Sequence, residues 1–150
     1  MIIKPKNKMI DVFDINYDVI LEEAYIKHKK LIVAFDFDNT VFDYHKKEVD
    51  YSKIINLLKE CQDLGFILKL FTSETSEDKL DWKIKYCTEI LGLNINQTKN
   101  KNDLSKVYAN IYLDDKAGLY EAFSRLKFLI EKIKLQSNVN QYFNYNFLTQ

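Results

Sequence analysis

Two aspartates, Asp36 and Asp38, follow directly after an apolar run over residues 31–35. Five consecutive apolar residues predict a strand that is buried on both faces of a parallel sheet. Side chains alternate along an extended chain, so the two carboxylates are expected to point the same way into one small volume. Like charges held that close raise each other's pKa unless a cation lies between them. The pair therefore predicts a site for a hard, oxygen-seeking ion such as Mg²⁺.

Two later apolar runs, over residues 66–71 and 111–113, also end in polar side chains. The polar residues at these two ends are Thr72, Ser73, Asp114 and Asp115. In an open parallel sheet the ligand site lies outside the carboxyl ends of the strands. We therefore expect all three strand ends to contribute to one pocket. Each group also has a purely structural interpretation, since Asp and Thr favour turns and helix N-caps.

The segments around these strands have the periodicity of amphipathic helices or short strands. Helices are predicted over 16–30, 52–64, 76–91 and 119–135, and a further short strand over 93–97. Strands and helices alternate through the middle of the chain, which predicts an α/β fold with right-handed crossovers. The expected architecture is an open parallel sheet with helices on both faces, a three-layer α/β/α sandwich.

Some local features are predicted within these elements. The first helix is expected to pack against the sheet through apolar positions that include Val19, Ile20 and Ile26. Ser52 is the predicted N-cap of the second helix, and Gly65 is its predicted C-terminal stop. These positions set where the helices meet the sheet.

The whole chain, residues 1–150, is expected to form one domain. Its predicted parts are an N-terminal extension with a helix, a motif-bearing core, a final helix and a tail, over 1–30, 31–118, 119–135 and 136–150. The tail is rich in Asn and Gln, and it is expected either to be disordered or to be anchored on the domain by aromatic residues. These residues are Tyr142, Phe143, Tyr145 and Phe147.

Composition narrows the range of functions. The hydrophobic content of 47% over 150 residues is enough for a sizeable core. Lys plus Arg and Asp plus Glu number 22 each, so no long-range field favours nucleic acid or an anionic membrane. No apolar run approaches membrane-spanning length. Cys61 and Cys87 have no CxxC spacing, which predicts reduced, buried thiols and a cytoplasmic location.

Four features occur in an order that resembles the haloacid dehalogenase (HAD) superfamily of phosphotransferases. They are the run DFDNT over 36–40, the strand that ends in Thr72, a lysine, and the acidic pair Asp114 and Asp115. The resemblance extends from about residue 31 to about residue 118. It implies a HAD-like Rossmannoid fold. Receiver domains of two-component signalling share some of these residue types, but they place the acidic pair on the first strand.

The resemblance also implies a role for each matching residue. Asp36 would be the nucleophile that forms an aspartyl-phosphate, and Asp38 would be the general acid and then the general base. Thr72 would donate its hydroxyl to a phosphoryl oxygen. Mg²⁺ would be held by the carboxylate of Asp36, the backbone carbonyl of Asp38, and the acidic pair at 114 and 115.

A lysine would neutralise the charge on the transferring phosphoryl group. Lys106 is the expected residue, because it precedes the acidic pair in SKVYANIYLDD, although Val107 stands where the related pattern has proline. Lys99 and Lys101 remain alternatives. Asn39 and Ser73 are further expected phosphate-binding residues, beside Thr72 and Lys106.

The intervals between the motifs are filled by core elements, so no cap domain is expected. The open site would then suit macromolecular phosphate ends, or be covered by a neighbouring subunit in a homo-oligomer. The only segment that could act as a flap over the pocket spans residues 41–48 and holds Phe42, Asp43, Tyr44 and His45. Its aromatic residues either stack on a base or sugar of the substrate, or pack on the core.

Three functional hypotheses follow from these observations. The favoured one is a Mg²⁺-dependent phosphomonoester hydrolase that acts on a small phosphorylated metabolite or nucleotide. The second is a phosphatase of a polynucleotide end or a phosphoprotein, which the neutral net charge counts against. The third is a non-catalytic metal-binding or interaction module with the HAD fold. No membrane partner is expected.

Overall fold

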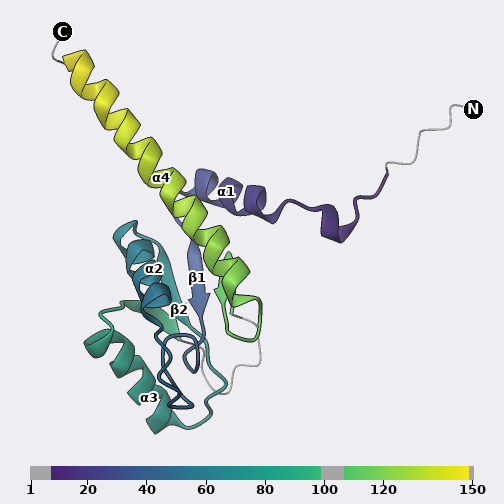
Figure 1. Cartoon of the computed structure of the whole chain (residues 1–150), viewed down its shortest axis with the longest axis vertical. Helices are drawn as coiled ribbons and strands as arrows, with labels where there is room; N and C mark the ends of the chain where they lie inside the picture. The colour runs from purple at the N-terminus through teal and green to yellow at the C-terminus, as the bar shows by residue number, and fades with distance from the viewer. Residues whose placement is uncertain (1–7, 99–106, 149–150) are drawn as a thin grey trace, which may run out of the picture.

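A four-stranded parallel sheet organises the chain in the computed structural model, which describes residues 8–98 and 107–148 (Figure 1). The strands are β1 (Ile32–Phe35), β2 (Ile67–Leu70), β3 (Ile95–Thr98) and β4 (Ile111–Leu113). Their order in the sheet is β3-β2-β1-β4. The predicted α/β fold with an open parallel sheet is confirmed.

Strand β1 lies inside the sheet and carries the deepest part of the core. It pairs with β2 on one side and β4 on the other, so that Val33 lies opposite both Leu68 and Ile111. Val33, Ala34 and Phe35 are fully buried. This explains the uninterrupted apolar run, because a strand covered on both faces has no solvent side for polar residues. The residues that follow β1 therefore emerge between the ends of two neighbouring strands.

The helices that accompany the sheet match most of the predicted segments. They are α1 (Tyr17–His28), α2 (Ser52–Asp63), α3 (Glu77–Lys85) and α4 (Leu119–Leu148), with a short 3₁₀ helix η1 (Val12–Asp14) and a π-helical turn η2 (Tyr86–Ile90) that continues α3. Helix α2 packs on β2 and on α4, while α4 packs on β4 and on α1. Residues 99–106, which include three lysines, lie outside the described residues.

The start of α2 differs by one residue from the prediction. Ser52 was expected to be the N-cap, but it is the first helical residue and Tyr51 occupies the cap position. The Asp50 carboxylate accepts a hydrogen bond from the Ser52 amide at 2.8 Å. The side chain of Asp50, and not that of Ser52, thus accepts a hydrogen bond from an amide at the start of the helix. Gly65 follows the helix with φ +80°, as a C-terminal stop requires.

Helix α1 packs differently from the prediction. Val19, Ile20 and Ile26 are all about half exposed, so the expectation that they pack against the sheet is wrong. Ala24, a fourth apolar position expected to pack, lies against the core, as do Leu21 and Tyr25. Polar pairs add contacts between α1 and α4. Arg125 Nε lies 2.7 Å from an oxygen of Asp18, and Lys132 Nζ lies 2.7 Å from an oxygen of Glu22. These ion pairs are exposed, so each contributes at most about 1 kcal/mol.

The chain after residue 135 is helical, and both predictions for this tail are wrong. Helix α4 continues to Leu148, and its C-terminal half runs away from the sheet (Figure 1). Tyr142, Phe143 and Tyr145 are exposed instead of anchored on the domain, and the side chain of Phe147 lies outside the described part. The chain has no Gly or Pro beyond Gly118, so nothing in this segment ends the helix.

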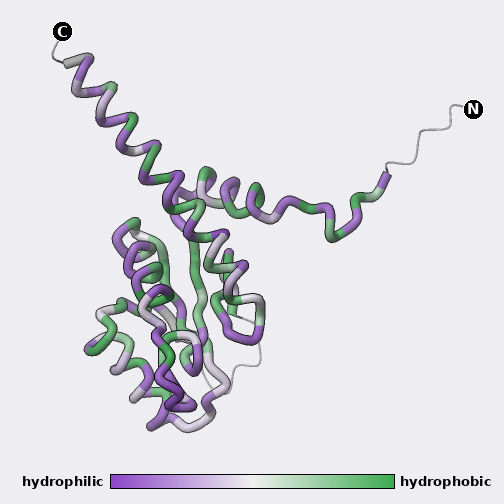
Figure 2. The backbone as a smooth tube through the Cα atoms, viewed as in Figure 1, coloured by the Kyte–Doolittle hydropathy of each residue, from purple (hydrophilic) through white to green (hydrophobic). Residues whose placement is uncertain are grey.

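The hydropathy of the chain follows this arrangement (Figure 2). The strand β1 is hydrophobic along its length, while the projecting half of α4 mixes hydrophobic and hydrophilic residues.

Cys61 and Cys87 are buried and free, as predicted, and burial raises the pKa of each thiol to about 12. Of the helices within the described residues, none combines the length and the apolar character needed to cross a membrane.

Candidate functional site

Three carboxylates meet where β1 and β4 end. Asp36 follows β1, and Asp114 and Asp115 follow β4. Each of the three offers a ligand oxygen, and these oxygens all lie within 4.8 Å of one another. The two strands are parallel neighbours, so their carboxyl ends lie side by side and bring together acids that are far apart in sequence. The structure therefore places these three predicted site residues at one point.

Backbone hydrogen bonds hold the two acidic segments together. The Asp36 amide donates to the Leu113 carbonyl at 2.9 Å, which extends the pairing of β1 with β4 beyond the strand. The Asp115 amide donates to Oγ1 of Thr40 at 3.1 Å. Thr40 is fully buried. Its hydroxyl thus ties the loop after β1 to the loop after β4, and it fixes the spacing of the carboxylates.

The ionised form of Asp36 is unfavourable when no cation is bound to the three carboxylates. Burial, and then the neighbouring carboxylates of Asp114 and Asp115, raise the pKa of Asp36 to about 7, against the opposing effect of a hydrogen bond from the Phe37 amide. A carboxylate desolvated beside two others favours its protonated form. A cation at this position would remove that penalty, because it interacts with all three charges at once.

The raised pKa of Asp36 predicts how the stability of the metal-free protein depends on pH. Between about pH 4 and pH 7 the folded chain binds more protons than the unfolded chain, so the free energy of unfolding falls as the pH rises through this window. The expected loss from this group is about 1–2 kcal/mol, because solvent screens a half-buried carboxyl.

Urea unfolding in EDTA, near pH 5 and near pH 8, measures this effect. The variant Asp36→Asn should lose this part of the pH dependence and be the more stable protein near pH 8. The variant Asp63→Asn, at an exposed position in α2, is the matched control and should behave as the wild type. Equal pH dependence in the wild type and Asp36→Asn would contradict the prediction.

A buried lysine forms a second cluster with two of the predicted site residues. Nζ of Lys83 lies 2.8 Å from Oδ2 of Asp38 and 3.2 Å from Oγ1 of Thr72. It also lies 3.7 Å from a carboxylate oxygen of Glu74. Lys83 is only 5% exposed. Because the ammonium group bridges the segments after β1 and β2, it brings Asp38 and Thr72 together.

Sequence reasoning missed Lys83, although one signal could have found it. In α3 the residue lies three positions after Leu80 and four before Cys87, which places a lysine on the apolar stripe of an amphipathic helix. Charged residues are rarely buried unless they are paired, so such a position indicates an acidic partner. The predicted phosphate-binding lysine, Lys106, and its alternatives Lys99 and Lys101 lie outside the described residues.

The other predicted phosphate-binding residues have different surroundings. Asn39 adopts φ 59°, a conformation that asparagine tolerates better than most residues, and its amide donates to the Phe42 carbonyl at 2.7 Å. The backbone of Asn39 thus shapes the loop after β1. Ser73 is exposed beside Thr72. The carboxylate of Asp38, which pairs with Lys83, is not part of the three-carboxylate group.

The segment predicted to be a flap divides into two parts. Phe42 packs inward, with its ring stacked on Phe37 at a centroid distance of 5.2 Å. Tyr44 and His45 are exposed and contact each other edge to face. The Asp43 carboxylate accepts hydrogen bonds from two amides of the same segment and so stabilises its turn. Phe42 thus packs on the core, as one of the two interpretations expected, and its side chain also lines a pocket.

The two clusters have complementary chemical properties. Three carboxylates around one point are the ligand set that hard divalent cations prefer. A buried ammonium group between a carboxylate and a hydroxyl can stabilise an anion that enters the same place. Comparison of the chain with protein-family models, with curated proteins and with solved structures found no match.

Proposed function

We propose that the chain is a Mg²⁺-dependent phosphomonoester hydrolase of the HAD type, which acts on a small phosphorylated molecule through an aspartyl-phosphate. The observation that carries the proposal is the meeting of Asp36 with Asp114 and Asp115 within 4.8 Å, at the carboxyl edge of a parallel sheet. The proposal also includes the full architecture of the fold, which would be a three-layer α/β/α sandwich without a cap domain.

In the first step Asp36 attacks the substrate. A carboxylate oxygen of Asp36 forms a bond to phosphorus, and the bond between phosphorus and the ester oxygen breaks. The leaving oxygen takes the proton of the Asp38 carboxyl group, so that a neutral alcohol departs. Asp38 suits this role because it is two residues from the nucleophile and is held in place by Lys83.

In the second step water releases the phosphate. The Asp38 carboxylate takes a proton from a water molecule, and the water oxygen attacks phosphorus. The bond between phosphorus and Asp36 breaks, which yields inorganic phosphate and restores both aspartates. The general acid of the first step is thus the general base of the second, and no further reactant is needed.

The three-carboxylate group fits a bound Mg²⁺. Within the described residues, no lysine or arginine makes an ion pair with Asp36, Asp114 or Asp115. Among the described residues, these charges therefore lack the protein cation that carboxylates in such close contact require. The side chains of these residues and the backbone carbonyl of Asp38 would hold the ion, which supplies positive charge beside the phosphoryl oxygens.

Lys83 and Thr72 would bind the other phosphoryl oxygens. In the absence of substrate the Lys83 ammonium lies between the Thr72 hydroxyl and the Asp38 carboxylate. An entering phosphoryl group would accept hydrogen bonds from both donors, which stabilises the charge that develops in the transition state. Lys106 remains a prediction from the sequence, and either lysine satisfies the chemistry.

Hydrolysis of p-nitrophenyl phosphate by protein stripped with EDTA tests the proposal. Addition of Mg²⁺ should raise the rate at least about tenfold, because the ion neutralises the carboxylates and the phosphoryl oxygens. Ca²⁺ is the matched control, since its larger radius and looser coordination should support much less activity. A rate of hydrolysis that does not change when Mg²⁺ is added, or no hydrolysis with any metal, would contradict the proposed function.

A further inference from the structure

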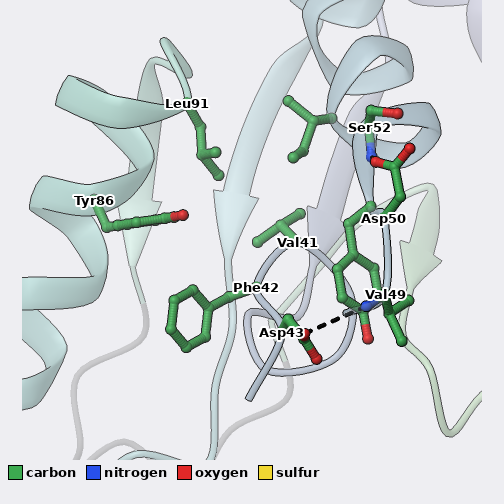
Figure 3. A pocket seen from close by; sticks show the side chains of 10 residues that line it. Val41, Phe42, Asp43, Val49, Asp50, Ser52, Tyr86 and Leu91 are labelled. Carbon is green, nitrogen blue, oxygen red and sulfur yellow. Dashed lines mark hydrogen bonds between the residues drawn. The ribbon is translucent and has the colours of Figure 1, made fainter. Parts of the chain in front are cut away.

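A pocket of about 280 Å³ opens next to the loop after β1 (Figure 3). Its walls come from the loop after β1, from the residues that lead into α2, and from η2 and the residue after it. Figure 3 shows Tyr86 and Leu91 on the side of η2, and Val41 and Phe42 on the loop after β1. Two stretches of the chain, over 41–55 and 86–91, thus line one space, and none of the lining residues belongs to the three-carboxylate group.

Short links connect the pocket to the reacting groups. Val41 follows Thr40, whose hydroxyl accepts the hydrogen bond from the Asp115 amide. Phe42 forms an isolated bridge with Asp38. Burial and then the carboxylates of Asp43 and Asp115 raise the pKa of Tyr51, another residue that lines the pocket. These links place the pocket next to the loops that carry Asp38 and Asp115.

The lining is apolar and acidic. Aliphatic and aromatic side chains form most of it, and the polar groups include the carboxylates of Asp43 and Asp50. Both carboxylates accept hydrogen bonds from nearby amides, which hold them in place, and the bond from the Ser52 amide lowers the pKa of Asp50. Among the described residues that line the pocket there is no lysine or arginine. A second phosphate would be repelled here, and a polynucleotide would find none of the cations that bind its backbone.

The size of the pocket limits its occupant as well. Pockets for drug-sized ligands enclose roughly 300 to 1,000 Å³, so this one lies just below that range and suits a smaller group. The rings of Phe42 and Tyr86 stand edge to face at 5.3 Å, which leaves an aromatic wall for a flat or aliphatic body to contact. The acidic groups offer acceptors to hydroxyl substituents.

We propose that this pocket binds the leaving group of the substrate, and that the leaving group is a small neutral alcohol or phenol with an apolar body and no second phosphate. The inference rests on the proposed phosphomonoester hydrolase activity. It names the substrate class that the open site selects, and it excludes a polynucleotide end from that class.

The fluorescence of Trp82, the single tryptophan of the chain, can be used to measure binding in this pocket. Trp82 lies outside the lining, but its ring is 5.4 Å from that of Phe42 and 5.5 Å from that of Tyr86. A ligand that contacts these two lining residues should change the fluorescence of Trp82. Because the signal does not need turnover, binding can be measured in the variant Asp36→Asn, in which no substrate is consumed.

Two measurements test the inference. In Asp36→Asn, benzyl phosphate and benzyl alcohol should each change the Trp82 fluorescence saturably, whereas methanol should not. In the wild type, kcat/KM should be about tenfold higher for benzyl phosphate than for methyl phosphate, whose leaving alcohols are of similar acidity, because an aromatic body gains about 1 kcal/mol or more in an apolar pocket. Addition of a second phosphate to the aryl ring should abolish that advantage.

Two pocket variants and one control complete the design. Tyr86→Ala removes a lining ring, and Val49→Glu adds a charge at a rim position that is 48% exposed, so it should not disturb folding. Both should lower kcat/KM for benzyl phosphate about tenfold and leave methyl phosphate unchanged. Tyr142→Ala removes an exposed ring of α4 that does not line the pocket, and it should change neither substrate.

The outcomes separate the two proposals. If methyl and benzyl phosphate are hydrolysed equally well and neither pocket variant changes either rate, the leaving group does not bind here, although the hydrolase proposal stands. If no phosphomonoester is hydrolysed by the wild type, the proposed function fails and the leaving-group assignment fails with it. If a bisphosphate is the better substrate, the acidic lining does not exclude anions and the substrate class is wrong.

Discussion

Asp36→Asn is expected to lower kcat for p-nitrophenyl phosphate at least about 10³-fold, because the amide oxygen is a poor nucleophile and no aspartyl-phosphate can form. The same variant should fold normally. Asp36 lies in a strained cluster of like charges, so loss of its charge should leave the protein at least as stable near neutral pH. The measurement is steady-state hydrolysis with Mg²⁺, together with urea unfolding of the same samples.

The control for this variant is Asp63→Asn, which makes the same chemical change at an exposed position in α2, outside the carboxylate group. It should retain full activity. If Asp36→Asn kept wild-type activity, the aspartyl-phosphate mechanism would be wrong even if the protein bound Mg²⁺. Trapping of acid-stable phosphate on the wild type is not expected, since an acyl phosphate hydrolyses readily with Asp38 beside it.

Lys83→Met is expected to lower kcat/KM about 10²-fold, which is the usual cost of removing one charged donor that stabilises the transition state. Methionine keeps most of the apolar stem that packs near the Phe37 ring, so the change mainly removes the charge. The loss should also destabilise the fold by about 1–3 kcal/mol, because Asp38 is left without its ion-pair partner. Activity and urea unfolding are measured on the same preparation.

The matched control is Lys85→Met, two residues along the same helix and exposed. It should affect neither rate nor stability. A second comparison separates a structural role from a role in binding phosphate. Inorganic phosphate should inhibit the wild type competitively, and the inhibition should weaken in Lys83→Met in parallel with kcat/KM. Loss of stability with unchanged phosphate inhibition would show that Lys83 only holds Asp38 and Thr72 in place.

The main elements of the fold could be predicted from local patterns. Residues 31–35 and 111–113 are apolar without interruption, and each run ends at an acid, so both the strand and its end can be found in the sequence. The α/β alternation then places the acids of different strands on one edge of the sheet. The meeting of Asp36 with Asp114 and Asp115 also requires that β4 lies next to β1, which the order of the sheet shows.

The ends of the chain were predicted less well, for a different reason. Apolar residues such as Val19 and Tyr142 occur at helical spacing, and this pattern normally indicates a face that packs on the core. In the structure both are exposed, and α4 continues far beyond the sheet. Periodicity shows that a segment can be a helix, but it does not say whether another element is close enough to cover its apolar face.

Lys83 shows the same limit within the site. Its position on the inner face of α3 is visible in the sequence, but its partners are Asp38, Thr72 and Glu74, which come from the ends of other strands. Which carboxylate a buried lysine meets depends on where the helix crosses the sheet. No local pattern contains that information.

The sequence by itself determined the parallel sheet, which strands end in acidic residues, and which kinds of side chain form the site. These features depend on short-range periodicity and on the direction of the strands. Only the tertiary structure decided that a lysine of α3 bridges Asp38 and Thr72, and that the loop after β1 and η2 enclose an apolar, acidic pocket. Such contacts depend on how helices lie across the sheet, which is set by the packing of the whole core.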